Sequence, residues 1–308
     1  MTVRLFALLV LLAFTTAYAP AAFAAVSCTA TTNDMDYGDV TLPAGAVTTT
    51  TVVDITCTGT GSDRGDDVRL CVGLETPLSP RRMTTGGEFI SHRLYRDAAY
   101  SEEINYTNVN PERVVTMPNS RTFTTQLAIY GRLQGNSAGA GPGSYSELVS
   151  GAFGWSKTAP SCSTVPALQY VAFRSSARVQ AACTVAANDL AFGKHSQLVA
   201  SIDASTSLGV TCTVGTPYLV RMDGGTTANN VADRRMGLNG TGPAAQGVRY
   251  ELRSQSADGP LWGDTAATGV AGVGSGTSQT LPVYGRVLPQ AVPLPGQYED
   301  TVTVTVQY

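Results

Sequence analysis

Hydrophobic and polar residues alternate along much of this chain with a period of two residues. The clearest run is residues 301–308, whose apolar face consists of Val302, Val304, Val306 and Tyr308. Other β-branched or alternating runs are residues 48–58, 68–74 and 122–132. A period of two is typical of β-strands, because successive side chains of a strand point to opposite faces. Segments rich in glycine and proline separate these runs, so the pattern predicts an all-β fold built from immunoglobulin-like sandwiches.

The first residues follow a different pattern, which predicts a cleaved export signal. Arg4 precedes an apolar run over residues 5–14, and Ala22-Phe23-Ala24 follows it. This order of charge, apolar core and A-x-A site is typical of a secretory signal peptide. We expect residues 1–24 to be removed and the remaining chain to be exported through the periplasm. Lipid attachment at Cys28 is the alternative, although Ala25 stands where such a motif usually has leucine.

The two halves of the chain carry the same short motifs in the same order. Cys28 and Cys57 are 29 positions apart, as are Cys183 and Cys212, and an aromatic-Gly pair follows the first cysteine of each half. The other shared motifs are RRM at 81–83 and 234–236, YGR at 130–132 and 284–286, and G-x-Y at 143–145 and 296–298. Common order and near-equal spacing indicate two copies of one domain. We therefore predict an N-terminal domain over residues 25–164 and a C-terminal domain over residues 181–308.

The repeat also orders the six cysteines, which allow 15 disulfide connectivities when taken alone. It predicts that Cys28 pairs with Cys57 and that Cys183 pairs with Cys212. Cys71 and Cys162 have no counterparts in the second half, so we expect them to pair with each other. Structural disulfides are favoured over redox catalysis, because an exported chain meets an oxidising compartment and no C-x-x-C motif occurs.

Composition argues against most enzymatic and nucleic-acid-binding functions. Charged residues make up 14% of the chain, the net charge is −3, and there are only two histidines, His92 and His195. No basic surface for nucleic acid is indicated by such a balance. The histidines lie in different domains, and no cluster of cysteine, histidine and carboxylate has metal spacing. We expect no catalysis, no cofactor and no metal; a carbohydrate-active enzyme is the remaining catalytic alternative.

The two domains are expected to differ in completeness. Residues 165–180 alternate like a strand, and we predict that they complete the N-terminal domain in cis as its seventh strand. The residues that would face inward are Val165, Ala167, Val171 and Phe173. The C-terminal domain is predicted to lack a seventh strand, because the sequence stops on the alternating run that ends at Tyr308. Only three residues precede Cys28 after signal removal, so no free N-terminal arm is expected.

The motifs C-x8-[FY]-G, R-R-M, L-x-V-Y-G-R and G-x-Y-x-D-T-V resemble those of the spore coat protein U domain, a family that includes pilins of archaic chaperone–usher pili. The match is closest at residues 281–286 and 296–302, whereas the first half has a less regular last strand and extra cysteines. The resemblance implies that an incomplete pilin domain accepts a donor strand from the next subunit. The acceptor and chaperone-binding strand would then present Val302, Val304, Val306 and Tyr308.

A two-domain member with an open C-terminal domain and no donor arm resembles the tip subunit of such a pilus. The implied partners are a periplasmic chaperone, an outer-membrane usher, the next pilin subunit and an abiotic or host surface, with biofilm formation as the outcome. A secreted coat or matrix protein of the same family is the alternative function. Absence of neighbouring chaperone and usher genes would favour that alternative.

The loops at the outward end of the N-terminal domain are predicted to make the adhesive contact, because they are long and carry apolar residues. They span residues 58–67, 97–121 and 150–163. Their apolar members are Ala98, Ala99, Tyr100, Ile104, Tyr106, Val109, Val114, Val115, Met117, Phe153 and Trp155. The alternative is that these side chains pack against the sandwich in small clusters.

Overall fold

The computed structural model describes residues 26–42, 45–74, 80–104, 110–134 and 139–308; the predicted signal peptide lies outside them. The described N-terminal strands are β1 (Ser27–Thr32), β2 (Met35–Thr41), β3 (Thr48–Thr58), β4 (Asp67–Leu74), β5 (Arg81–Thr85), β6 (Glu88–Tyr95), β7 (Glu112–Thr116), β8 (Thr122–Leu133), β9 (Gly143–Ser156) and β10 (Gln169–Gln180). The C-terminal strands are β11 (Cys183–Ala187), β12 (Ile202–Cys212), β13 (Pro217–Met222), β14 (Arg234–Leu238), β15 (Val248–Arg253), β16 (Val270–Val273), β17 (Ser278–Val287), β18 (Tyr298–Glu299) and β19 (Val304–Gln307). Four short 3₁₀ helices are η1 (Gly61–Asp63), η2 (Cys162–Thr164), η3 (Val231–Asp233) and η4 (Ala244–Gln246).

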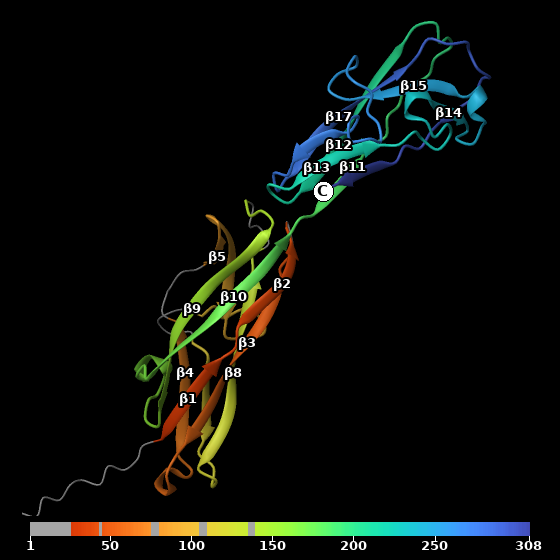
Figure 1. Cartoon of the computed structure of the whole chain (residues 1–308). Coiled ribbons are helices and arrows are strands. Elements are labelled where there is room, and N and C mark those ends of the chain that lie inside the picture. The colour runs from red at the N-terminus through yellow and green to blue at the C-terminus, as the bar shows by residue number, and fades with distance from the viewer. Residues whose placement is uncertain (1–25, 43–44, 75–79, 105–109, 135–138) are drawn as a thin grey trace, which may run out of the picture.

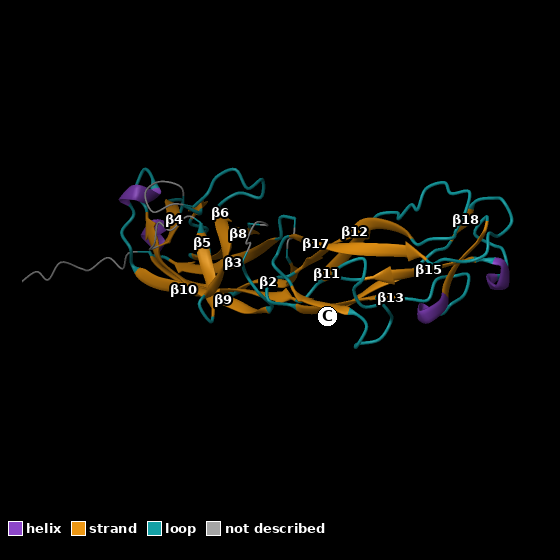
Figure 2. Cartoon of the chain, turned by 90° about the horizontal axis from the view of Figure 1, so that it is seen from above, coloured by secondary structure: helices purple, strands orange, loops and turns teal. Residues whose placement is uncertain are grey.

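Two β-rich domains follow each other end to end, and β10 of the first leads directly into β11 of the second (Figure 1). In the N-terminal domain one strongly curled sheet has the order β1-β3-β8-β6-β5-β9-β10-β2, with β4 joining β9 and β7. In the C-terminal domain the sheets are β11-β12-β17-β15-β14-β18 and β16-β13-β19. The view from above shows the same linear arrangement, with strands filling both domains (Figure 2). The prediction of an all-β chain with two tandem sandwiches is therefore confirmed.

The repeated motifs occupy equivalent places in the two domains. Cys28 lies opposite Cys57 where β1 pairs with β3, and Cys183 lies opposite Cys212 where β11 pairs with β12. Both pairs are disulfide-bonded, and a third disulfide joins Cys71 of β4 to Cys162. RRM opens β5 and β14, and YGR lies in β8 and β17. The repeat in the sequence is thus a repeat of strand positions.

The segment that the sequence suggests as the closing strand of the N-terminal sandwich contains β10. In the sheet, β10 lies between β9 and β2. It pairs antiparallel with β9 and parallel with β2. Val171 and Phe173 are buried on β10, as predicted for an inward-facing strand. The predicted start of that strand was wrong: Val165 and Ala167 precede β10, half-buried and exposed respectively. Residues 162–164 form η2 instead, and the disulfide at Cys162 holds this turn against β4.

A buried threonine makes polar contacts at the junction between the two domains. Thr213, which follows β12, is 1% exposed. Its hydroxyl lies 3.2 Å from the carbonyl oxygen of Leu42 in the N-terminal domain and 3.2 Å from that of Gln180. Its amide donates to the carbonyl of Ala182 at 2.9 Å. The end of β10 is therefore held against the body of the second domain.

Candidate functional site

Among the described residues of the C-terminal domain, no strand lies along the edge that β10 covers in the N-terminal domain. Residues 190–196 hold the place of β2, but they form no strand, and β19 pairs only with β13 among the residues that the structure describes. Its counterpart β9 pairs with both β4 and β10. Within the described part of the C-terminal domain, no strand corresponds to β10. An unpaired strand edge of this kind can accept another strand through its backbone N–H and C=O groups.

The open edge leaves core positions partly uncovered. Met35 and Tyr37 pack so closely over Gly131 that a Cβ there would lie 2.5 Å from the Met35 sulfur. Leu190 and Phe192 pack over Gly285 in the same way, since a Cβ at that glycine would lie 2.9 Å from the Phe192 ring. Met35 and Tyr37 are buried, whereas Leu190 and Phe192 are half-buried. The same positions therefore lose cover where the β10 equivalent is absent.

The last run of the chain borders this edge, although not as one continuous strand. Val302 precedes β19 and lies in a segment bonded to the 223–227 loop: the Asp223 amide donates to the carbonyl of Thr303 at 3.1 Å. Val302, Val304 and Val306 are half-buried and pack against the core of the domain. Tyr308 lies beyond β19 and is exposed. The predicted single strand over residues 301–308 is thus interrupted, but its apolar alternation is preserved.

A polar cluster lies beneath the middle of the open edge. Asp300 accepts a hydrogen bond from the Tyr250 hydroxyl at 2.7 Å and from the Thr227 amide at 3.0 Å. Burial, with a further contribution from this bond to Asp300, raises the pKa of Tyr250. Arg234 is fully buried and donates to the carbonyls of Asp223, Met222 and Trp262, while burial lowers its pKa. The surface formed by Leu190, Phe192, Val302, Val304, Val306 and Asp300 is called the groove below. It is apolar towards β19 and polar at Asp300.

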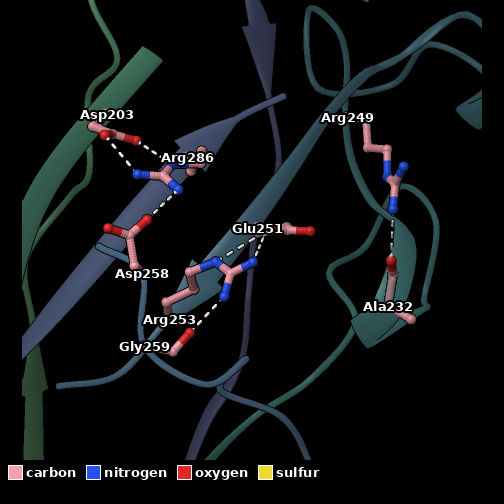
Figure 3. Close-up of polar contacts among 8 residues, drawn as sticks. All are labelled: Asp203, Ala232, Arg249, Glu251, Arg253, Asp258, Gly259 and Arg286. Atoms are coloured by element: carbon pink, nitrogen blue, oxygen red, sulfur yellow. Dashed lines mark hydrogen bonds and ion pairs between the residues drawn. The ribbon is translucent and has the colours of Figure 1, made fainter. Parts of the chain in front are cut away.

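The main C-terminal sheet carries several ion pairs that involve arginines of β15 and β17 (Figure 3). Arg286 of β17 contacts Asp203 at 2.6 Å and Asp258 at 2.7 Å, and these hydrogen bonds raise its pKa. Arg253 contacts Glu251 at 2.6 Å and also bonds the carbonyl of Gly259. These contacts tie the 254–260 loop to the sheet. Exposed pairs contribute little to stability individually, so their main effect here is to fix the loop.

The free end of the N-terminal domain is identified by the direction of its strands. β10 ends at Gln180 beside the second domain, so its start at Gln169 lies towards the opposite end. Three connections meet at that end: residues 59–66, 117–121 and 157–168. The amide of Gly59 donates to the carbonyl of Arg121 at 2.8 Å, and that of Met117 donates to Asp66 at 2.8 Å. The free end is thus a set of mutually bonded loops.

The side chains of this end are mainly polar. Lys157 contacts Asp63 at 2.6 Å and Asp66 at 2.9 Å. The bonds from Lys157 and Thr60 hold the pKa of the Asp63 carboxyl well below its usual range. Exposed residues of the three loops include Ser62, Arg64, Asn119, Ser120, Arg121, Thr158 and Ser163. Polar side chains therefore make up most of the exposed groups of these loops, whereas Leu168, at the end of the third loop, is apolar and exposed.

Several of the predicted adhesive residues belong to the core. Phe153 is fully buried because β9 continues to Ser156, and Met117 is 2% exposed. Ile104, Val115 and Trp155 pack against the same core, and the Trp155 indole donates to the carbonyl of Val26 at 2.7 Å. For these five residues the prediction of exposed contact was wrong, and packing against the sandwich was the correct alternative.

The remaining predicted residues lie on the flank or outside the described ranges. Tyr100 is half-buried, and its ring packs edge-on against those of Tyr95 and Tyr130, at the end of β8 away from the tip. Ala98 and Ala99 are exposed beside it, and Val114 is exposed on β7. Tyr106 and Val109 fall outside the described residues.

The long connection that suggested adhesion is a shared feature of both domains. Residues 96–111 join β6 to β7, and residues 254–269 join β15 to β16, which makes sixteen residues in each case. In both, an isolated bridge pairs the end of the preceding strand with the connection: Tyr95 with Glu103, and Arg253 with Leu261. Its length therefore carries no information about the specialised end.

The structure reveals one apolar surface that the sequence analysis missed. Leu148 of β9, Leu168 just before β10, and Tyr170 of β10 are all exposed, with Tyr170 at 61%. The Tyr170 hydroxyl lies 3.0 Å from that of Ser150 on the neighbouring strand. Leu168 and Tyr170 lie near the free end, and Tyr170 takes an outward position of the strand that buries Val171 and Phe173. Apolar residues on both faces of the predicted strand were the available signal.

The described residues include one group of possible metal ligands and both histidines. Cys71, Glu112 and Cys162 lie close enough together to hold an ion, but both thiols are used in a disulfide. His92 is buried, 3.0 Å from the Tyr37 hydroxyl and 3.0 Å from Glu147. His195 is exposed and contacts the carbonyl of Phe192. In the described part of the chain, none of the helices has the length and hydrophobicity needed to span a bilayer.

Comparison with known proteins gives one family and several similar folds. One chain of a crystal structure of the chaperone–tip adhesion subunit pre-assembly complex, from archaic chaperone–usher Csu pili of Acinetobacter baumannii, matches with a TM-score of 0.54 and 19% identity, over 92% of this chain and 100% of that chain. The CupB6 tip adhesin of Pseudomonas aeruginosa matches with a TM-score of 0.42 and 10% identity, over 92% of this chain and 94% of that one. No curated protein matches in sequence.

The Csu likeness supports the fold of two tandem sandwiches. The family model of the Spore Coat Protein U domain matches residues 13–151 and again residues 169–305. Each match coincides with one set of the repeated motifs described above. The chain therefore belongs to the spore coat protein U domain family.

Proposed function

We propose that this protein is the adhesive subunit at the tip of an archaic chaperone–usher pilus. The observation that carries the proposal is the open edge of the C-terminal domain, set against the closed edge of the N-terminal one. Residues 165–180 would serve as linker and cis strand between an adhesive domain over residues 25–164 and a pilin domain over residues 181–308. The closed domain then faces outward, and the open domain joins the fibre by donor-strand complementation.

The proposal names the partners that the open edge requires. A periplasmic chaperone would cover the groove after export, and an outer-membrane usher would exchange it for the strand of the next subunit. The half-buried Leu190, Phe192 and Val306 give such a strand an apolar surface to bury, and burial of apolar area is the main driving force for association. The similarity in fold to a chain of a chaperone–tip adhesion subunit complex agrees with this assignment.

Replacing Val306 by aspartate is expected to prevent incorporation into fibres. The charge would lie among the half-buried apolar residues of the groove, where a carboxylate without a partner is costly. The matched control is Thr305→Asp, one position along β19 on the exposed face. Immunoelectron microscopy of cells that carry an epitope in the 59–66 loop measures the amount at fibre ends. Equal incorporation of both variants, with each domain intact by protease resistance, would contradict the proposal.

A secreted coat or matrix protein of the same family is the second candidate. It has the same domains, and the exposed apolar side chains of the groove would then be covered within a coat layer. Labelling separates the two: a pilus subunit is found at the ends of thin fibres, and a coat protein is spread over the surface. Loss of fibre-end labelling on deletion of the usher would support the first function.

Attachment to an apolar abiotic surface is expected to fall several-fold when Leu168 and Tyr170 are both replaced by serine. Leu168 and Tyr170 are large exposed apolar residues near the free end. Serine at either position would bury less apolar area at a contact with the surface. The measurement is retention of fibre-bearing cells on polystyrene under flow. Val273→Ser is the control, because Val273 is similarly exposed in the C-terminal domain. Unchanged retention of the double variant would exclude this surface.

A further inference from the structure

We propose that the open edge of the C-terminal domain selects a strand with a definite side-chain pattern. From its N-terminus, at alternate positions, the strand carries two apolar residues, a serine-sized residue, an alanine-sized residue and a final apolar residue. This inference rests on the proposed function, because it describes the partner of the same groove. The pattern comes from the strand that already fills the equivalent groove in this chain.

In the N-terminal domain, β10 supplies this pattern to the groove. Its buried residues are Val171, Phe173, Ser175, Ala177 and Val179. They lie opposite Gly151, Val149, Glu147, Tyr145 and Gly143 of β9, respectively. Arg174 and Arg178, on the other face of β10, are exposed. The inward residues are therefore the ones that pack into the domain, and Arg174 and Arg178 face away from it.

The C-terminal groove presents the same order of positions. The repeated G-x-Y motif aligns Gly143 with Gly296 and Tyr145 with Tyr298, which places Asp300, Val302 and Val304 at the positions of Glu147, Val149 and Gly151. From Tyr298 to Val306, every second residue is half-buried and those between are exposed. An incoming strand in the register of β10 would thus set its five inward residues opposite Val304, Val302, Asp300, Tyr298 and Gly296.

The small positions follow from the chemistry at Tyr298 and Asp300. Tyr145 and Tyr298 each donate from the hydroxyl to the carbonyl four residues earlier, at 2.8 Å, so their rings are fixed in the same way. Ala177 is the buried residue directly opposite Tyr145 where β10 pairs with β9. A larger side chain would have to displace a ring held at its far end.

The middle position is small and lies beside buried charges. Ser175 is fully buried opposite Glu147, which contacts Arg81 at 2.7 Å and His92 at 3.0 Å, and the Ser175 hydroxyl itself has no hydrogen-bond partner among the described residues. In the C-terminal domain Asp300 takes the place of Glu147, and the Nη1 atom of the buried Arg234 has no hydrogen-bond partner among the described residues. A leucine at this position would remove the remaining solvent from Asp300 without offering a donor, which is unfavourable for a carboxylate.

The test adds a copy of the chain's own strand to its C-terminus. Residues 156–180, with Cys162→Ser, are appended directly after Tyr308, which corresponds to Trp155, so that connector and strand continue as in the N-terminal domain. The thermal unfolding midpoint of the C-terminal domain should rise by about 10 °C or more, since the added strand covers several apolar side chains. In the copy, Ser175→Leu should remove most of this rise. Arg174→Leu, the same change on the outward face, should leave the rise intact.

A cross-link checks the register. Phe173→Cys in the copy should form a disulfide with Val302→Cys and not with Tyr298→Cys. If the unmodified copy gives no rise in midpoint, strand acceptance itself is wrong and the proposed function falls with it. If the copy stabilises the domain but Ser175→Leu and Arg174→Leu behave alike, or the cross-link forms at Tyr298→Cys, the groove accepts a strand and the pattern proposed here is overturned.

Discussion

Replacing Phe173 by alanine is expected to lower the free energy of unfolding of the N-terminal domain by about 3–5 kcal/mol. Phe173 is 3% exposed and lies opposite the fully buried Val149, so the change removes a large side chain from the centre of the core. Domains of this kind are stable by only about 5–15 kcal/mol, so the loss is a large fraction of the total. Because Phe173 belongs to β10, its loss weakens the cover that this strand gives to the N-terminal core.

The measurement can be confined to one domain. The two tryptophans, Trp155 and Trp262, lie in different domains, so urea unfolding followed by fluorescence in a Trp262→Phe background reports on the N-terminal domain. Arg174→Ala, next to Phe173 but exposed, should change stability by less than about 0.5 kcal/mol. A loss below about 1 kcal/mol for Phe173→Ala would mean that β10 is not part of the core, and the contrast between a closed and an open domain would no longer hold.

The repeated motifs made the strand framework predictable. Cys28–Cys57 and Cys183–Cys212 share one spacing, and a repeated spacing between cysteines constrains both the disulfides and the pairing of the strands that carry them. The cis strand could be predicted for a similar reason: Val171 and Phe173 alternate with polar residues in the segment that joins the two copies. These signals are local in sequence, so they can be recognised without knowing which faces of the sheets pack together.

The adhesive end was harder to predict because alternation does not say where a strand stops. The pattern places Phe153 in a loop because the first half lacks the regular Val/Thr strand of the second, yet β9 continues to Ser156 and carries Phe153 into the core. Met117 is buried at the free end, and its backbone is hydrogen-bonded to Gly65 and Asp66, which are distant from it in sequence. Length alone singles out the 96–111 connection, whereas comparison with residues 254–269 identifies it as common to both domains.

The difference between the domains extends to how the seventh strand is anchored. In the N-terminal domain, β10 is tied at its end by the continuation into β11 and the contacts of Thr213. Near its start it is tied by Cys162, which is bonded to Cys71 on β4. A strand anchored at both ends has a high effective concentration in its groove, and therefore re-forms its pairing rapidly after local opening.

Replacing Cys71 and Cys162 together by serine is therefore expected to destabilise the N-terminal domain strongly. The disulfide closes a loop with a sequence separation of 91, against 29 for Cys183 and Cys212. In the chain-entropy model these loops correspond to about 4.5 and about 3.5 kcal/mol. The same fluorescence measurement should show a loss of that order, together with faster proteolysis within residues 157–168. Cys183→Ser with Cys212→Ser is the control, since it should weaken only the C-terminal domain. An unchanged N-terminal domain, still resistant to protease at residues 157–168, would show that pairing with β9 and β2 alone keeps the cis strand in place.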